Sequence, residues 1–151
     1  MACAGFASPV GRLTITARDG AITALDWGAA DAEDSTPELD EARRQLTAYF
    51  DGALTEFDLP LRVEGSGFQR DVCAQIAAIP FGETRSYGDI ARALGAPAQA
   101  VGAGCGGNPI PIMIPCHRVL GATGLGGFSG AGGVETKVWL LRHEGAAGLL
   151  I

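Results

Sequence analysis

Glycine is the residue that most restricts what this chain can fold into. The 151-residue sequence contains 23 glycines, which concentrate after residue 95. Glycine weakens the interiors of helices and strands but permits tight turns and close approach of backbones. The second half is therefore expected to be rich in loops and closely packed backbone. Hydrophobic residues make up 47% and charged residues 19%, which indicates a folded globular chain rather than a disordered one.

Residues 1–63 predict an α/β domain. Apolar residues alternate along 13–17, Asp19-Gly20 is a hairpin signal, and an extended pattern resumes at 22–27. Thr36-Pro37 predicts the start of a helix, because proline is favoured at the first helical position. The apolar residues that follow at helical spacing are Leu39, Ala42, Leu46, Tyr49 and Phe50.

Residues 64–151 predict a mainly α-helical domain. Ser66 is expected to cap a helix whose apolar stripe comprises Phe68, Val72, Ile76 and Ile79. Ser86 and Asp89 have the spacing of a capping box before a short helix that Gly95 closes. Pro97 then begins a helix over 98–105, and two short helices joined by such a turn resemble a helix-turn-helix.

The remaining segments of this domain are short. Small residues along 98–105 would let a partner backbone approach closely, but composition alone favours tight packing inside the protein. The apolar run 110–114 predicts a buried strand or extended segment, and 121–133 predicts a glycine-rich loop. A last helix is expected to carry Val134, Val138 and Leu141 on one stripe and to end at Glu144-Gly145.

Charge and cysteine spacing restrict the class of function. The net charge of −6 argues against binding along long stretches of DNA, because phosphate neutralisation supplies most non-specific affinity. A small footprint built on a few basic groups and backbone N–H groups remains compatible. The irregularly spaced cysteines are Cys3, Cys73, Cys105 and Cys116, and the histidines are His117 and His143. No disulfide framework, metal site or cofactor is predicted from them.

The expected cellular location of the protein rests on the absence of targeting signals in the sequence. No apolar run approaches the roughly 18 residues that a membrane-spanning helix needs. Residues 1–10 lack the basic and apolar regions of a signal peptide. A cytoplasmic protein with reduced thiols and no membrane partner is therefore expected.

The dipeptide Cys116-His117 is the first candidate for chemistry. A thiol with a pKa near 8.5 is mostly protonated at neutral pH, and a nearby imidazole can take its proton directly or through water. The pair follows an apolar run and precedes a glycine-rich loop, a junction where reactive groups are often presented. A buried cysteine beside a surface histidine is the simpler interpretation of the dipeptide alone.

Glu144 is a further candidate, because negative charge is disfavoured in the last turn of a helix. Either water solvates it or a cation or N–H donor pairs with it. Pairing with His117 would orient the imidazole. A solvated glutamate at the helix end is the better interpretation on sequence alone.

Several spaced motifs together point to one family. The run 108–119, NPIPIMIPCHRV, closely resembles the active-site signature of methylated-DNA–protein-cysteine methyltransferases. Residues 68–72, 79–83 and 86–88 resemble the opening of that family's C-terminal domain, and 137–145 resembles its closing helix. The resemblance is good over roughly the last 90 residues and loose over the first 60, and ordered motifs are more specific than one tetrapeptide.

The resemblance implies an RNase-H-like α/β lobe, then a helical lobe with a helix-turn-helix that binds the DNA minor groove and flips out O6-alkylguanine. Cys116 would accept the alkyl group in a single turnover, without a cofactor. His117 would act as base through water, Glu144 would orient it, Tyr87 would donate a proton to guanine, and Asn108 would be the hinge residue. The residues expected to border substrate or DNA are Gln99, Gly102, Cys105, Phe128, Ser129 and Arg118, the last as a structural ion-pair residue. A monomer acting on double-stranded DNA is expected.

The positions that depart from the family pattern are residues expected to contact DNA rather than the nucleophile Cys116. Gln99 stands where the family has an arginine that fills the gap left by the flipped base, and Phe128 replaces a usual tyrosine. The sequence therefore predicts alkyl transfer with weakened binding to duplex DNA. The sequence leaves two alternative functions open, of which the second is the weaker. A module that binds alkylated DNA without chemistry fits Gln99 and the acidic charge, and a cysteine hydrolase or redox enzyme lacks a CxxC partner and an oxyanion-hole motif.

Overall fold

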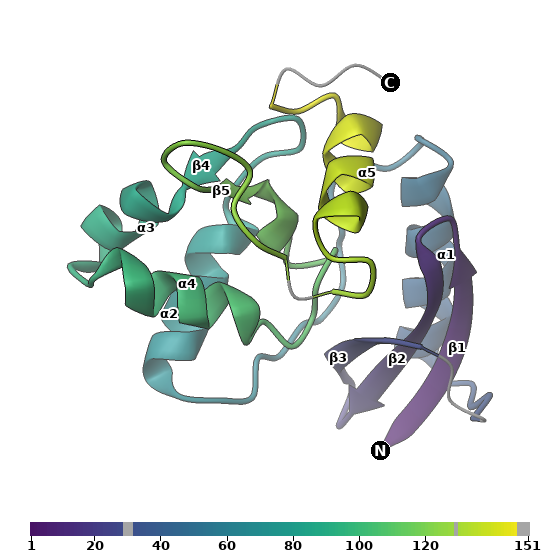
Figure 1. The fold of residues 1–151 in the computed structure, drawn as a ribbon. Helices are drawn as coiled ribbons and strands as arrows, with labels where there is room; N and C mark the ends of the chain where they lie inside the picture. The colour runs from purple at the N-terminus through teal and green to yellow at the C-terminus, as the bar shows by residue number, and fades with distance from the viewer. Residues whose placement is uncertain (29–31, 129, 148–151) are drawn as a thin grey trace. The chain divides into compact units, whose positions relative to one another are not determined.

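The computed structural model describes residues 1–28, 32–128 and 130–147. The chain divides into two compact units, Met1–Glu64 and Gly65–Ile151, and Figure 1 shows the sheet and one helix in the first and the remaining helices in the second. Among the described residues, no helix is both long and apolar enough to cross a membrane.

The first unit is an antiparallel sheet packed against one helix. Strands β1 (Ala2–Ser8), β2 (Gly11–Arg18) and β3 (Ala21–Trp27) lie in the order β1-β2-β3, and α1 (Pro37–Phe50) contacts all three. Asp19 and Gly20 both have positive φ, as the predicted hairpin requires. The side chains of the core include Leu13, Ile15, Ile22, Leu25, Leu39 and Leu46. Strand β1 was not predicted, because Ala4 is its only buried residue and its sequence carries no strong alternation.

Local signals set the ends of α1. The Thr36 side chain accepts a hydrogen bond from the Leu39 N–H at 3.2 Å, and Pro37 occupies the first turn. The helix ends at Phe50, before Asp51. The predicted start of this helix is therefore confirmed.

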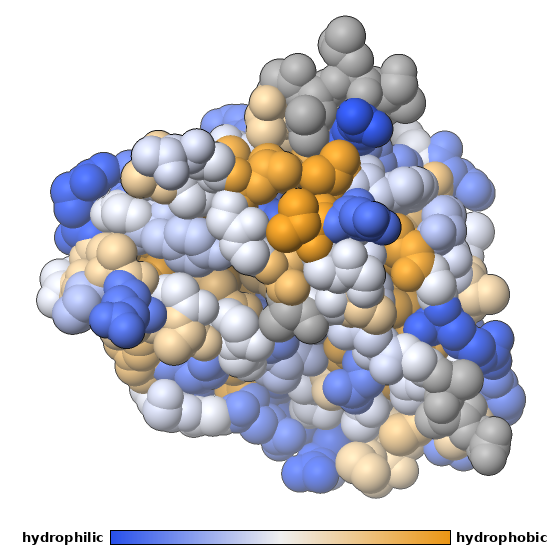
Figure 2. Space-filling view, viewed as in Figure 1, coloured by the Kyte–Doolittle hydropathy of each residue, from blue (hydrophilic) through white to orange (hydrophobic). Residues whose placement is uncertain are grey.

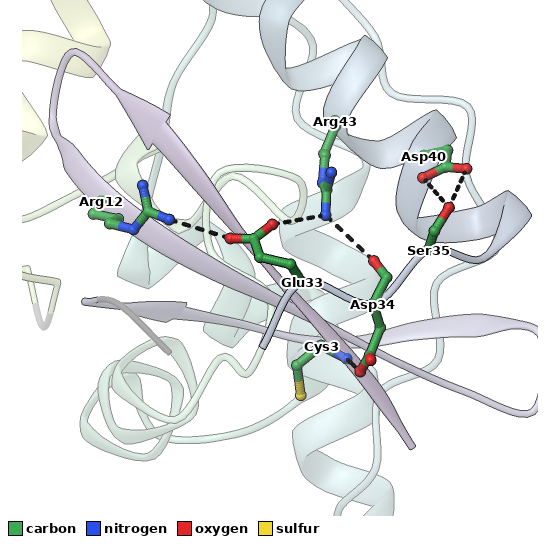
Figure 3. A network of polar contacts seen from close by, with 7 residues as sticks. All are labelled: Cys3, Arg12, Glu33, Asp34, Ser35, Asp40 and Arg43. Atoms are coloured by element: carbon green, nitrogen blue, oxygen red, sulfur yellow. Dashed lines mark hydrogen bonds and ion pairs between the residues drawn. The ribbon is translucent and has the colours of Figure 1, made fainter. Parts of the chain in front are cut away.

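A network of hydrogen bonds and ion pairs links the segment before α1 to β1, β2 and α1 (Figure 3). The Glu33 carboxylate accepts hydrogen bonds from Arg12 and Arg43, each at 3.3 Å. The Asp34 carboxylate accepts from the Cys3 N–H at 2.9 Å. Glu33 also forms a bridge to Ala4, so this segment covers part of the free edge of β1.

The described residues of the second unit form four α-helices and a two-stranded parallel sheet. The helices are α2 (Gly67–Ala77), α3 (Tyr87–Leu94), α4 (Ala98–Gly106) and α5 (Val134–Glu144). Strand β4 (Arg85–Ser86) pairs with β5 (Val119–Leu120), which follows the 3-10 turn η1 (Cys116–Arg118). The predicted capping box of Ser86 and Asp89 is confirmed, and Gly95 ends α3 in the left-handed conformation. Helices α3 and α4 contact each other.

Residues 110–114 form a buried turn, so the predicted strand or extended segment is wrong. The Ile114 N–H donates to the Ile110 carbonyl at 2.9 Å, and Ile112 has a φ of 72°. Asn108 binds the Ile110 N–H and the Ile114 carbonyl with its side chain. The amide satisfies two backbone polar groups of the buried turn, and hydrogen bonds within the turn satisfy others.

The apolar stripe predicted for α5 is also wrong, although the helix ends as expected at Glu144. Val134 is 45% exposed and Val138 is only half-buried, whereas Lys137, Leu141 and Glu144 are buried. Figure 2 shows strongly hydrophobic surface in the region of this helix. The buried face therefore shares only Leu141 with the predicted stripe and includes two charged side chains.

Candidate active site

The second unit contains a cavity of about 490 Å³ beside Cys116. Its lining residues come from α3, α4, η1 and the glycine-rich loop, and they are Tyr87, Gly102, Cys105, Gly106, Cys116, Gly127 and Phe128. Five of these seven were expected from the sequence to be catalytic or to border substrate. Gly106 and Gly127 were not, because no sequence signal distinguishes them from the other glycines.

The buried turn at residues 110–114 and the following η1 present the Cys116 thiol to this cavity. The Cys116 N–H donates to the Ile114 carbonyl at 2.8 Å, and the Arg118 N–H donates to the Pro115 carbonyl at 2.9 Å. Cys116 is 7% exposed. Burial raises the pKa of this thiol, while a hydrogen bond with Asn108 and the charge of Lys137 lower it. The thiol at rest is therefore protonated, and its reaction needs a proton acceptor.

Asn108 connects α4 to the cysteine turn. Its amide nitrogen donates to the Ile114 carbonyl at 2.8 Å, and its amide oxygen accepts from the Ile110 N–H at 3.0 Å. Because the amide spans both ends of the buried turn, it fixes the backbone that leads to Cys116. The hinge role expected for Asn108 stays a prediction.

His117 and Arg118 both bind Glu144 in the protein interior. His117 Nε2 lies 2.8 Å from Glu144 Oε2, and Arg118 Nε lies 2.8 Å from Glu144 Oε1. Arg118 also donates to the Ile79 carbonyl at 2.7 Å. Glu144 therefore is not the solvated helix-end residue that sequence alone favoured. Arg118 forms an ion pair with Glu144 and is not among the described residues that line the cavity.

The ionisation of this group leaves His117 able to accept a proton. Burial would raise the pKa of Glu144, but hydrogen bonds from His117 and Arg118 lower it to about 2. Burial lowers the pKa of His117, so the imidazole is neutral and donates its Nε2 proton to the carboxylate. His117 Nδ1 then carries the lone pair, and it is buried without a hydrogen-bond partner among the described residues.

Tyr87 and Cys105 are neutral groups of the cavity wall. Burial raises the pKa of Tyr87, and the nearby thiols add to the effect, so its hydroxyl remains a proton donor. Burial raises the pKa of Cys105 to about 12. Cys105 therefore remains a thiol at neutral pH and is a poor second nucleophile.

Lys137 is the functional residue that sequence reasoning missed. It is fully buried, and its ammonium donates to the Val119 carbonyl at 2.7 Å and to the Gly127 carbonyl at 3.0 Å. It joins α5 to the cavity wall and places a positive charge near Cys116. The available signal was its spacing of four residues from Leu141 and seven from Glu144, which puts a lysine on the buried face.

The other predicted residues lie in different places. Gln99 is exposed near the start of α4 and does not line the cavity. Ser129 falls outside the described residues. Within the described part of the chain, no group of three or more His, Cys, Asp or Glu side chains could hold a metal ion.

Together these features define a class of protein that places a buried thiol at the wall of a cavity, where it can act as a nucleophile toward a group held there.

Comparisons with known proteins identify the family. Residues 1–63 match "6-O-methylguanine DNA methyltransferase, ribonuclease-like domain", and residues 67–146 match the "DNA binding domain" of the same name. The methylated-DNA–protein-cysteine methyltransferase of Mycolicibacterium paratuberculosis is 48% identical, covering 91% of this chain and 88% of the relative. The constitutive enzyme of Bacillus subtilis is 40% identical, covering 91% of each.

Comparison with solved structures supports the same family. Mycobacterium tuberculosis OGT in complex with DNA has a TM-score of 0.86 to this structure at 41% identity, covering 96% of this chain and 93% of that one. The chain therefore belongs to the 6-O-methylguanine DNA methyltransferase family. The predicted family and the α/β and helical lobes are confirmed, while the helix-turn-helix assignment of α3 and α4 stays a prediction.

Proposed function

We propose that this protein repairs DNA by transferring the alkyl group of O6-alkylguanine to its own Cys116. The observation that carries the proposal is the placement of Cys116 in a cavity next to the buried group of His117, Glu144 and Arg118. Family membership supports the same reaction, since the relatives are named methylated-DNA–protein-cysteine methyltransferases.

The reaction is a displacement at saturated carbon. His117 Nδ1 takes the Cys116 proton through a water molecule, and the sulfur attacks the carbon attached to guanine O6. The carbon–oxygen bond breaks as the carbon–sulfur bond forms, and its electron pair goes to the guanine. Tyr87 donates a proton to the leaving guanine. Because the thioether is stable and nothing regenerates the thiol, each molecule acts once.

DNA is the proposed partner, bound through the unit that contains the cavity. The family description of residues 67–146 as a DNA binding domain supports this assignment. A base inside a duplex cannot reach a buried thiol, so the damaged nucleotide is expected to be flipped out from the minor-groove side. Action as a monomer and a cytoplasmic location belong to the same proposal.

Intact-protein mass spectrometry tests the transfer. The protein is incubated with a duplex oligonucleotide that contains O6-methylguanine, and an unmodified duplex serves as control. The expected result is a gain of one methyl group per molecule, located on Cys116 by peptide mapping and absent from Cys116→Ala. Binding of the methylated duplex with no gain in mass would instead establish a binding module.

A further inference from the structure

Two thiols from different elements line the same cavity. Cys105 lies in the last turn of α4, and Cys116 is the first residue of η1. Both are free cysteines, and their exposed fractions are 6% and 7%. Among the described residues, no other cysteine lines this cavity. The sequence contains no CxxC partner for Cys116, but the fold brings a second thiol to the same wall.

The third buried thiol of this unit has a different environment. Cys73 on α2 is 1% exposed and is not among the described residues that line the cavity. Its Sγ lies 3.9 Å from Asn108 Oδ1 and 3.4 Å from Gln69 Nε2. Asn108 also forms a hydrogen bond with Cys116, so an amide adjoins both of these sulfurs. Cys105 is therefore the candidate partner for Cys116.

The backbone around Cys105 allows its sulfur to approach Cys116. A disulfide requires two Cα atoms within about 7 Å of each other. Gly106 ends α4 and Gly107 caps it, and glycine gives the backbone wide freedom at the end of a helix, where the ladder frays most easily. The Cys116 N–H, in contrast, is fixed by its hydrogen bond to the Ile114 carbonyl. The adjustment therefore falls on the last turn of α4.

Oxidation threatens a protein whose single acceptor is not regenerated. A thiol oxidised beyond the sulfenic acid is lost irreversibly, whereas a disulfide is restored by cellular thiols. We propose that Cys105 is the resolving cysteine of Cys116, so that a hydroperoxide converts the two thiols into a reversible disulfide that suspends alkyl transfer. The inference goes beyond the proposed function, because the disulfide forms without DNA.

The first step oxidises Cys116 alone. Its sulfur attacks one oxygen of the hydroperoxide, and the oxygen–oxygen bond breaks. The electron pair of that bond goes to the leaving oxygen, which takes up a proton. His117 Nδ1, which is buried without a hydrogen-bond partner among the described residues, accepts the thiol proton as it does in alkyl transfer. The products are the sulfenic acid of Cys116 and an alcohol, or water when the oxidant is hydrogen peroxide.

The second step joins the two cysteines. Cys105 Sγ attacks Cys116 Sγ, the sulfur–oxygen bond of the sulfenic acid breaks, and the hydroxide leaves as water with the proton of Cys105. Cys105 is a poor nucleophile as a neutral thiol, but this step is intramolecular because both residues line one cavity. In total, two thiols lose two electrons and one hydroperoxide is reduced.

Peptide mapping of the oxidised full-length protein tests the proposal. The protein is treated with a small excess of hydrogen peroxide and unfolded, and its remaining thiols are blocked with iodoacetamide. One disulfide leaves two of the four cysteines to be blocked, and a cross-linked peptide should join Cys105 to Cys116. Dithiothreitol should restore all of the thiols. Added oxygen on Cys116 without a cross-link, or a cross-link through Cys73, overturns the proposal.

Two matched variants, Cys105→Ala and Cys73→Ala, identify the resolving residue. The cross-link should persist in Cys73→Ala, whereas Cys105→Ala should accumulate the sulfinic acid of Cys116. After peroxide and then dithiothreitol, the wild type and Cys73→Ala should recover most of their methyl transfer, and Cys105→Ala less than about a tenth of it. Equal recovery in the two variants overturns the assignment.

The peptide map also separates this inference from the proposed function. Untreated protein that transfers no methyl group contradicts the proposed function, and the presence or absence of the cross-link still decides the role of Cys105. If Cys105→Ala does not unfold cooperatively, the map of the wild-type protein is the deciding result.

Discussion

The Glu144 carboxylate accepts hydrogen bonds from two side chains that lie 26 and 27 residues earlier in the chain. A glutamate in the last turn of a helix is normally disfavoured by the helix dipole. Here Arg118 supplies the compensating charge and His117 supplies a second donor. This pairing keeps a carboxylate ionised inside the protein and fixes the imidazole whose other nitrogen faces no partner among the described residues.

The ionised Glu144 should make stability depend on acid pH. Its pKa is about 2 in the folded protein against an ordinary 4.5, so its contribution is complete above about pH 4.5 and is lost as pH falls through 2. The difference corresponds to about 3 kcal/mol. The variant Glu144→Gln should be less stable at pH 7 by about 3–5 kcal/mol, because Arg118 is left buried without its partner.

Urea unfolding between pH 7 and pH 2 measures this effect. The variant should have a flatter dependence of unfolding free energy on pH below 4.5 than the wild type. Glu135→Gln, on the exposed surface of the same helix, is the control and should follow the wild type. Parallel curves for Glu144→Gln and the wild type would contradict the assigned ionisation.

Lys137 should control the ionisation of Cys116. Its charge lowers the pKa of a thiol that burial raises, so Lys137→Met should raise that pKa further. Methyl transfer near neutral pH should then slow by about tenfold for each unit of pKa, with partial recovery at higher pH. The measurement is the transfer rate as a function of pH, with Arg142→Met as an exposed-cation control on α5. A slower rate with an unshifted pH profile would assign Lys137 a purely structural role.

At the scale of elements, α4 is defined by contacts on two faces. Its residues are small and neutral, and its interior position Gly104 allows α4 to approach Val72 of α2. The composition-based expectation of tight internal packing thus holds for Gly104. The alternative, access for a partner, applies to the face of Gly102, which borders the cavity. Tight internal packing therefore describes the Gly104 side of α4, and access for a partner describes the Gly102 side.

Two alanine substitutions in α4 should have opposite effects. Gly104→Ala places a methyl group 2.9 Å from Val72, so overpacking should destabilise the protein by about 1–3 kcal/mol. Gly102→Ala meets open space, and the higher helix propensity of alanine should stabilise it by up to about 1 kcal/mol. Urea unfolding of both variants gives the comparison. Equal stabilities would show that the α2–α4 contact is looser than described.

At the scale of the whole molecule, a net charge of −6 must be reconciled with binding to a polyanion. The exposed start of α4 carries Gln99 where the family pattern has arginine, and the helix has no charged residue. Affinity is therefore expected to come from few phosphate contacts, with weak dependence on salt.

Gln99→Arg should tighten binding to duplex DNA and steepen its salt dependence. One added phosphate contact changes the slope of log affinity against log salt by about 0.9. Thr55→Arg, exposed in the first unit, changes net charge equally and is the control. Fluorescence anisotropy with an unmodified duplex over a range of salt concentrations provides the slopes. A steeper slope for Thr55→Arg than for Gln99→Arg would attribute the effect to net charge instead.

Local signals in the sequence determined the ends of most helices, the Asp19-Gly20 hairpin and the order of the motifs. Each acts through atoms a few residues apart, such as Thr36 with Leu39 or Ser86 with Asp89, so a short window contains the whole interaction. Together with the ordered motifs, they placed Cys116 and His117 at the centre of the predicted chemistry.

Only the tertiary structure decided the pairing of Arg118 with Glu144, the buried ammonium of Lys137 and the turn at residues 110–114. Arg118 reaches the Ile79 carbonyl across 39 residues, and Lys137 reaches the Val119 carbonyl across 18. Burial of a charge is favourable only when such distant groups converge on it. Periodicity within one helix contains no information on that convergence, which is why the buried face of α5 differed from its predicted apolar stripe.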